Sequence, residues 1–88
     1  MRPPSVQRRV QFAVLLQLAD AGVADPVATS TMVPGTDHRD FDAALEHLLY
    51  DGSIEGPPSR LESLPALAAD GRLTLTVRGQ TRLDEDDV

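Results

Sequence analysis

Hydrophobic residues recur at helical spacing along the first part of the chain and predict a long helix there. We expect it to begin near Pro4 or Ser5 and to end at Gly22. One face would carry Val6, Val10, Ala13, Val14 and Leu18, and the roughly opposite face Phe12, Leu15, Leu16 and Ala19. A helix that is apolar on two sides has to be covered on both. The second cover is either another part of the same chain or a second copy that packs on Phe12, Leu15 and Leu16.

A shorter second helix is expected over about residues 26–32. Asp25-Pro26 offers an N-cap followed by a first-turn proline, and Pro34-Gly35 would close the helix. The segment Ala28-Thr29-Ser30-Thr31 forms helices weakly, so we expect only a short element here.

The third helix has the clearest pattern in the chain. Thr36 or Asp37 would cap it, and Asp40 would add a favourable charge at its N-terminus. Asp51-Gly52 would end it. Its apolar positions have the spacing of an amphipathic helix: Phe41, Ala44, Leu45, Leu48 and Leu49.

From Ile54 onward the spacing changes and strands are expected. Residues 72–78 alternate between polar and apolar, as in a strand with one buried face. Asp70-Gly71 is a favoured two-residue hairpin turn, and across it the apolar positions of residues 64–68 would face those of the later strand. The sequence therefore predicts a β-hairpin here, in which Pro65 needs an edge position or a bulge.

The chain is expected to end in a helical turn and an acidic tail. Gly79 to Leu83 would form the turn, and the run Asp84-Glu85-Asp86-Asp87 would be a frayed, solvated end or a partner-binding segment. With 88 residues we expect one domain, over residues 1–83, followed by the tail at 84–88.

Composition and charge narrow the classes of function. The chain has no cysteine, which excludes disulfides, thiolate metal sites and thiol nucleophiles. It has no long apolar segment, so we expect neither a signal peptide nor contact with a membrane, and a cytoplasmic location. The net charge is −6, and residues 37–55 alone contain six acidic residues and one arginine. The acid is therefore concentrated in the third helix and in the tail.

No residue pattern indicates catalysis, a cofactor or a metal site. His38 and His47 lie on one helix at positions that point about 180° apart, so they cannot share a site within one chain. The glycines are explained by turns and form no phosphate-binding loop. No pair of carboxylates lies in a catalytic setting. We therefore expect a protein that is not an enzyme and that has no catalytic, cofactor-binding or metal-binding residues.

Two segments resemble winged helix-turn-helix domains. Residues 41–56, which read FDAALEHLLYDGSIEG, resemble their third helix and following strand. Residues 73–83, which read LTLTVRGQTRL, resemble their final strand and closing turn, commonly Leu-Thr, one or two residues, then Gly and a later Leu. The resemblance covers about residues 5–83. It implies a small α+β winged helix-turn-helix fold, with three helices and a C-terminal β-hairpin wing, although residues 56–69 are longer than a minimal wing.

This resemblance implies a small DNA-binding transcriptional regulator, in one form a homodimer. The exposed face of the third helix would then enter the major groove, where Arg39, Glu46 and His47 would read or approach the bases of double-stranded DNA. The residues that would hold phosphate are Arg8, Arg9, Arg60 and Arg72.

The acidic third helix supports a different hypothesis with the same fold. The domain would be a protein-interaction module that does not bind DNA, and it would present Asp42, Glu46 and Tyr50 to a basic protein surface. A third hypothesis is a structural subunit that dimerises through Phe12, Leu15 and Leu16. Neutralising Asp42 and Glu46 would weaken the second function and leave any DNA binding intact or improved.

Overall fold

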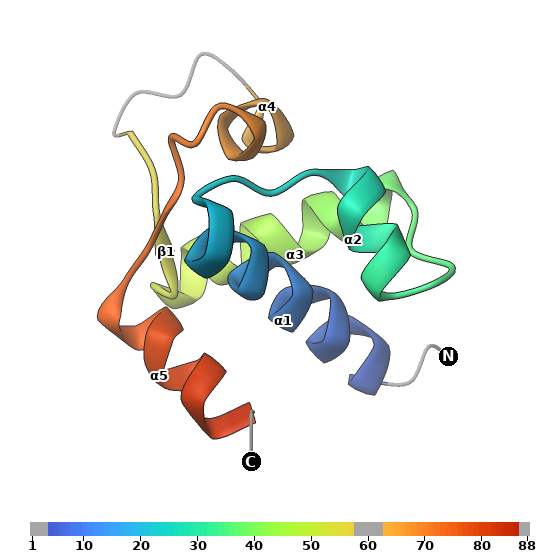
Figure 1. Ribbon diagram of the computed structural model, residues 1–88, viewed down its shortest axis with the longest axis horizontal. Coiled ribbons are helices and arrows are strands. Elements are labelled where there is room, and N and C mark those ends of the chain that lie inside the picture. Colours follow the sequence, from blue (N-terminus) through green and yellow to red (C-terminus); the bar gives the residue numbers. More distant parts are fainter. Residues whose placement is uncertain (1–3, 58–62, 87–88) are drawn as a thin grey trace.

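The structure, a computed structural model, describes residues 4–57 and 63–86. Within these ranges the chain forms a small, mostly helical α+β fold (Figure 1). Its elements are α1 (Pro4–Ala21), α2 (Pro26–Met32), α3 (His38–Asp51), β1 (Ile54–Glu55), α4 (Leu64–Ala69), β2 (Thr74–Leu75) and α5 (Val77–Asp86).

The three predicted helices of the N-terminal half are confirmed, with boundaries close to those expected. α1 ends before Gly22, whose positive φ of 76° is the left-handed conformation expected at a helix C-terminus. Asp37, and not Thr36, caps α3, and Gly52 ends it with a φ of 84°. The Thr36 hydroxyl instead donates a hydrogen bond to the Val33 carbonyl at 2.7 Å.

The core lies where α1 packs across α3, and the other elements close it (Figure 1). Among the described residues, the buried hydrophobic side chains are Val10, Ala13, Val14, Leu15, Leu18, Ala24, Val33, Phe41, Ala44, Leu45, Leu48, Ile54, Leu67, Ala68, Leu73 and Leu83. The second apolar side of α1 is covered only in part by its own chain. Leu15 is fully buried, whereas Phe12 is half-buried and Leu16 is exposed. Leu15 therefore belongs to the core and is not part of a surface that a second copy could contact.

Polar contacts fix α2 against α1. The Gln17 amide donates to the Thr29 hydroxyl at 2.7 Å, and its carbonyl oxygen accepts from the backbone N–H of Asp25 at 3.1 Å. Asp25 caps α2 by accepting from the backbone N–H of Ala28 at 2.7 Å. Thr29 is fully buried, and its hydroxyl donates in turn to the Asp25 carbonyl. Because these buried and half-buried groups satisfy one another, α2 has a defined position beside α1.

The predicted β-hairpin is wrong, because residues 64–69 form helix α4. Leu64, Leu67 and Ala68 are buried or half-buried, which is helical spacing, and Pro65 lies in the first turn, where a missing N–H costs nothing. Asp70-Gly71 ends this helix instead of turning a hairpin. Gly71 has a φ of 74°, and the backbone N–H of Arg72 donates to the Leu67 carbonyl at 2.9 Å, as in a helix C-terminus.

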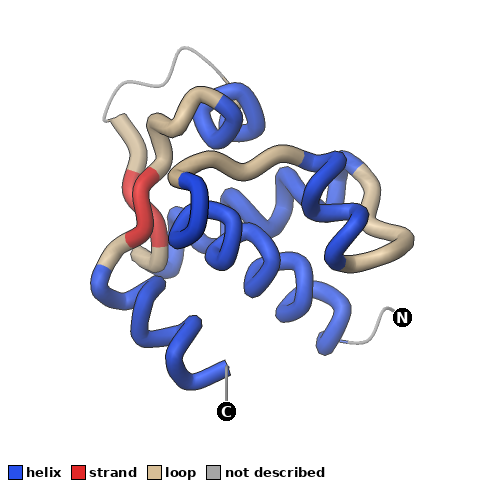
Figure 2. Tube along the Cα trace, in the orientation of Figure 1, coloured by secondary structure: helices blue, strands red, loops and turns tan. Residues whose placement is uncertain are grey.

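The strand that pairs with β2 is β1, so the sheet joins segments that are distant in sequence. β1 and β2 pair antiparallel, with Ile54 opposite Leu75 and Glu55 opposite Thr74 (Figure 2). The predicted strand over residues 72–78 is thus reduced to Thr74–Leu75. Val77, expected on its buried face, is exposed and begins α5.

The helical turn expected over Gly79 to Leu83 is part of a longer helix, α5. Its first turn is held by Thr76, whose hydroxyl accepts from the backbone N–H of Gly79 at 3.2 Å and donates to the Gly52 carbonyl at 2.6 Å. We expected a frayed end from residue 84, but Asp84 and Glu85 lie in α5. Asp84 accepts a hydrogen bond from the Gln80 side chain at 3.2 Å.

Candidate functional site

Two of the acidic residues near the start of α3 form its N-terminal cap. Asp37 accepts from the backbone N–H of Asp40 at 3.0 Å, and the Asp40 carboxylate accepts from the backbone N–H of Asp37 at 3.3 Å. This reciprocal capping box satisfies two helix N–H groups that have no partner within the helix. Asp40 is also buried. The negative charges of Asp37 and Asp40 therefore stabilise the N-terminus of α3, where the helix dipole is positive.

The outward face of α3 is exposed from its first turn to its last. The exposed residues are Arg39, Asp42, Ala43, Glu46, His47 and Tyr50. Tyr50 is 95% exposed, although its ring is large and apolar. The opposite face, with Phe41, Leu45 and Leu48, is buried. The structure thus brings together Arg39, Glu46 and His47 of the predicted base-reading set with Asp42 and Tyr50 of the predicted partner-binding set.

Asp51, at the C-terminal end of α3, is held by two arginines of α5. Arg82 donates to one carboxylate oxygen at 3.2 Å, and Arg78 lies 3.5 Å from the other. The Ser53 hydroxyl donates to Asp51 Oδ2 at 2.8 Å. This hydrogen bond lowers the pKa of Asp51 below its ordinary value of 3.8, and the charges of Arg78, Arg82 and His47 lower it further against the opposing effect of burial. Asp51 is therefore engaged in contacts within the chain, where it links the end of α3 to α5.

Removing the charge of Asp51 should change how stability responds to acid. Because the folded state lowers this pKa, the ionised carboxylate stabilises the fold above the ordinary value, and this contribution disappears as the pH falls through the lowered pKa. We expect the difference in unfolding free energy between wild type and Asp51→Asn to be largest near neutral pH and to shrink below about pH 4, as measured by urea unfolding. Asp42→Asn, at an exposed position, is the control. A difference for Asp51→Asn that does not vary with pH would contradict the assignment.

The cluster that Asp51 belongs to was not expected from the sequence. Arg82 also donates to Gln11 Oε1 at 2.9 Å and to Ser53 Oγ at 3.4 Å, so one guanidinium connects α1, the residues after α3, and α5. Gln11 and Ser53 are buried. The one signal in the sequence is Gln11 itself, a polar residue on the side of α1 that is otherwise apolar.

The residues predicted to hold phosphate are not part of α3. Arg8 and Arg9 are exposed on α1, together with Leu16. α1 packs across α3, and Arg8 and Arg9 therefore belong to a different helix from the face that carries Arg39, Glu46 and His47. Arg72 is exposed between α4 and β2, and Arg60 lies outside the described residues.

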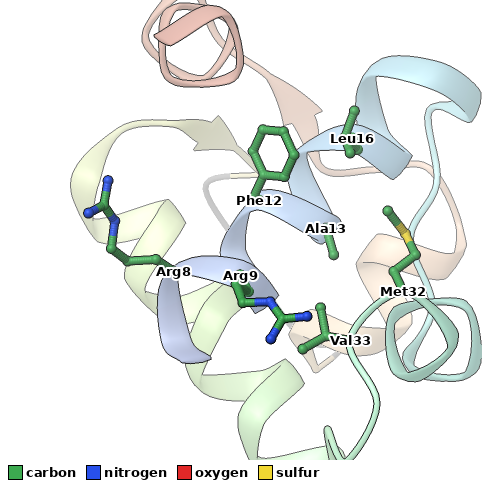
Figure 3. A pocket seen from close by; sticks show the side chains of 7 residues that line it. All are labelled: Arg8, Arg9, Phe12, Ala13, Leu16, Met32 and Val33. Carbon is green, nitrogen blue, oxygen red and sulfur yellow. The ribbon is translucent and has the colours of Figure 1, made fainter. Parts of the chain in front are cut away.

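The exposed side of α1 borders an apolar groove. A hollow of about 460 Å³ lies between α1 and the end of α2 (Figure 3). It is lined by Arg8, Arg9, Phe12, Ala13, Leu16, Met32 and Val33. Arg8 and Arg9 extend in different directions from the N-terminal end of this groove (Figure 3). The structure therefore places Phe12 and Leu16 of the predicted dimerisation set on this surface and adds Met32, which sequence analysis did not single out.

The described residues contain no cluster suited to a metal ion. No group of three or more His, Cys, Asp or Glu side chains lies close together within them. In the same residues no single helix is long and apolar enough to cross a membrane. Only α1 from Gln7 and α2, which meet at a bend of 118°, have the length and composition when taken together.

Comparisons with known proteins find no relative. No protein-family model matches this chain, and neither a curated protein nor a solved structure is significantly similar to it. The function is therefore inferred from the residues and their arrangement alone.

Proposed function

We propose that the chain is a winged-helix domain that binds double-stranded DNA with α3 in the major groove. The observation that carries the proposal is the outward face of α3, which is exposed along the whole helix. Fourteen residues make a helix about 21 Å long, and the major groove, about 12 Å wide, accepts one helix. The segment between β1 and β2 would be the wing, with α4 inside it.

The distribution of charge on α3 supports this proposal better than the net charge of −6 does. Asp37 and Asp40 serve the capping box, and Asp51 is paired with Arg78 and Arg82. The acidic side chains left on the outward face are Asp42 and Glu46. An acidic group there can accept a hydrogen bond from a cytosine amino group. Because few cations lie nearby, we expect weak binding that falls steeply with salt.

The test is the fluorescence anisotropy of a labelled duplex that is long enough for one domain. We expect binding at low salt that weakens near physiological salt, and a loss of at least about tenfold in affinity for Arg39→Glu. The matched control is Arg9→Glu, the same charge reversal on α1 instead of α3, which should change the affinity less than about twofold. Absence of binding at low salt, or equal losses for the two variants, would refute DNA binding by α3.

One observation favours the second candidate, a protein-interaction module. Asp42 and Glu46 are exposed, and neither forms an ion pair with a described residue. With the exposed ring of Tyr50 they would suit a basic protein surface. The double variant Asp42→Asn, Glu46→Gln separates the two functions, because it should raise affinity for DNA if α3 binds phosphate-rich surfaces. Absence of DNA binding by both wild type and the double variant, together with binding of a basic peptide by the wild type that the double variant loses, would support the protein-interaction module.

A further inference from the structure

A second hollow continues the apolar groove along α1. It measures about 450 Å³ and is lined by Leu16, Gln17, Ala19, Asp20 and Met32. The two hollows share Leu16 and Met32, so together they form one surface, which we call the α1–α2 groove. Leu16 is 37% and Met32 is 41% exposed. Nothing in the described part of the chain covers these side chains completely.

The two ends of the α1–α2 groove carry opposite charge. Arg8 and Arg9 lie at the end formed by the N-terminal half of α1, and Asp20 lies at the other end. Arg9 and Asp20 are about three helical turns apart, so they lie on the same side of α1, separated by about 16 Å along its axis. Neither of these two residues forms an ion pair with a described residue.

We propose that the α1–α2 groove is the contact surface for a second copy of this chain. The two α1 helices would lie antiparallel across a two-fold axis that passes midway between Phe12 and Leu16. An isologous contact requires a surface that is complementary to itself. Here Phe12 of each copy would meet Leu16 of the other, and the arginine end of each groove would meet Asp20 of the other.

The pattern of charges selects this occupant over others. A uniformly acidic segment would be repelled at Asp20, and a uniformly basic one at Arg8 and Arg9. A second copy in antiparallel orientation offers the opposite charge at both ends and apolar side chains in the middle. Met32 flanks the centre, where its flexible thioether can adapt to a facing side chain.

The proposed dimer differs from the one expected from the sequence. Leu15 is in the core and takes no part, while Met32 of α2 and the charged residues at the two ends do. No residue of α3 lines the α1–α2 groove, so the outward face of α3 takes no part in this contact. The inference does not rest on DNA binding, and either one can fail without the other.

The experiment is sedimentation equilibrium of the full chain over a range of concentrations. The interface is one helix with its flank, at the small end of specific contacts, so we expect dissociation in the range of about 1–100 µM. Arg9→Asp and Asp20→Arg should each weaken the dimer by at least about tenfold. The double variant Arg9→Asp, Asp20→Arg exchanges the two charges and should restore most of the affinity.

Leu16→Glu is a further variant, because it places a charge at the centre of the groove on a side chain that is already exposed. It should abolish the dimer while circular dichroism stays that of the folded protein. A monomeric wild type, a dimer that neither single charge variant weakens, or a double variant as weak as the single ones would each overturn the proposal. The charge exchange decides the question even if Leu16→Glu fails to fold.

Discussion

Gly79→Ala is expected to destabilise the protein by about 2–4 kcal/mol, the largest effect of any substitution to alanine at a glycine in the described part of the chain. Gly79 is buried in the first turn of α5, where that helix crosses the residues that follow α3. A Cβ at this position would overlap the Ser53 carbonyl oxygen and would also lie 2.7 Å from Leu75 Cδ1. The carbonyl oxygen belongs to the backbone and accepts from the N–H of Thr76, so it cannot move aside without breaking that bond.

Chemical denaturation of Gly79→Ala beside Gly35→Ala measures this effect. Gly35 has a φ of 90° and open space where its Cβ would be, so its replacement carries only the backbone strain of about 1 kcal/mol. Gly79→Ala reports the close approach of two backbone segments, whereas Gly35→Ala reports only the conformational preference of glycine. If Gly79→Ala loses no more stability than Gly35→Ala, the packing of α5 against Ser53 is not as described.

Gly79 also explains why the segment that resembles winged-helix domains contains Leu-Thr followed by a glycine. Leu75 ends β2, the Thr76 hydroxyl holds the first turn of α5, and Gly79 allows that turn to approach Ser53. The pattern therefore encodes a sharp passage from strand to helix. It says nothing about which ligand the domain binds, because none of these groups faces outward on α3.

Arg82→Met is expected to destabilise the protein by about 2–3 kcal/mol and to loosen α5 from the rest of the fold. The guanidinium is mostly buried and bonds to Asp51, Ser53 and Gln11. Methionine keeps the apolar stem but removes all three hydrogen bonds. Gln11 is buried and would keep an acceptor oxygen without a donor, which costs more than the bond itself contributes.

Arg78→Met is the matched control, because Arg78 contacts the same carboxylate of Asp51 from an exposed position. Its side chain is 67% exposed against 24% for Arg82. We expect its loss to cost no more than about 1 kcal/mol. Urea unfolding of both variants, with hydrogen exchange of the α5 amides, measures the contrast. Equal losses of stability in the two variants, or unchanged hydrogen exchange in α5 of Arg82→Met, would show that Arg82 does not anchor this helix.

Elements whose ends are set by neighbouring residues could be predicted from the amino-acid sequence. The side chains of Asp25 and Asp37 accept hydrogen bonds from backbone N–H groups three residues further on, and Gly52 ends α3 by its own conformation, so α2 and α3 have the expected limits. The single buried face of α3 follows from helical spacing in the same way. The exposed positions of Arg39, Glu46 and His47 could be predicted for this reason.

Where a local pattern suits both a helix and a strand, long-range contacts select the element that forms. Apolar residues at 64, 66 and 68 alternate as in a strand, but 64, 67 and 68 also form one face of a helix, and packing against α3 selects the helix. β2 pairs with β1, a partner that no local signal identifies. The placement of Arg9 beside the α1–α2 groove depends on which side of α1 is buried, and α1 is apolar on two sides. Local hydrogen bonds set where helices begin and end, whereas the choice between faces and partners depends on contacts between residues far apart in the chain.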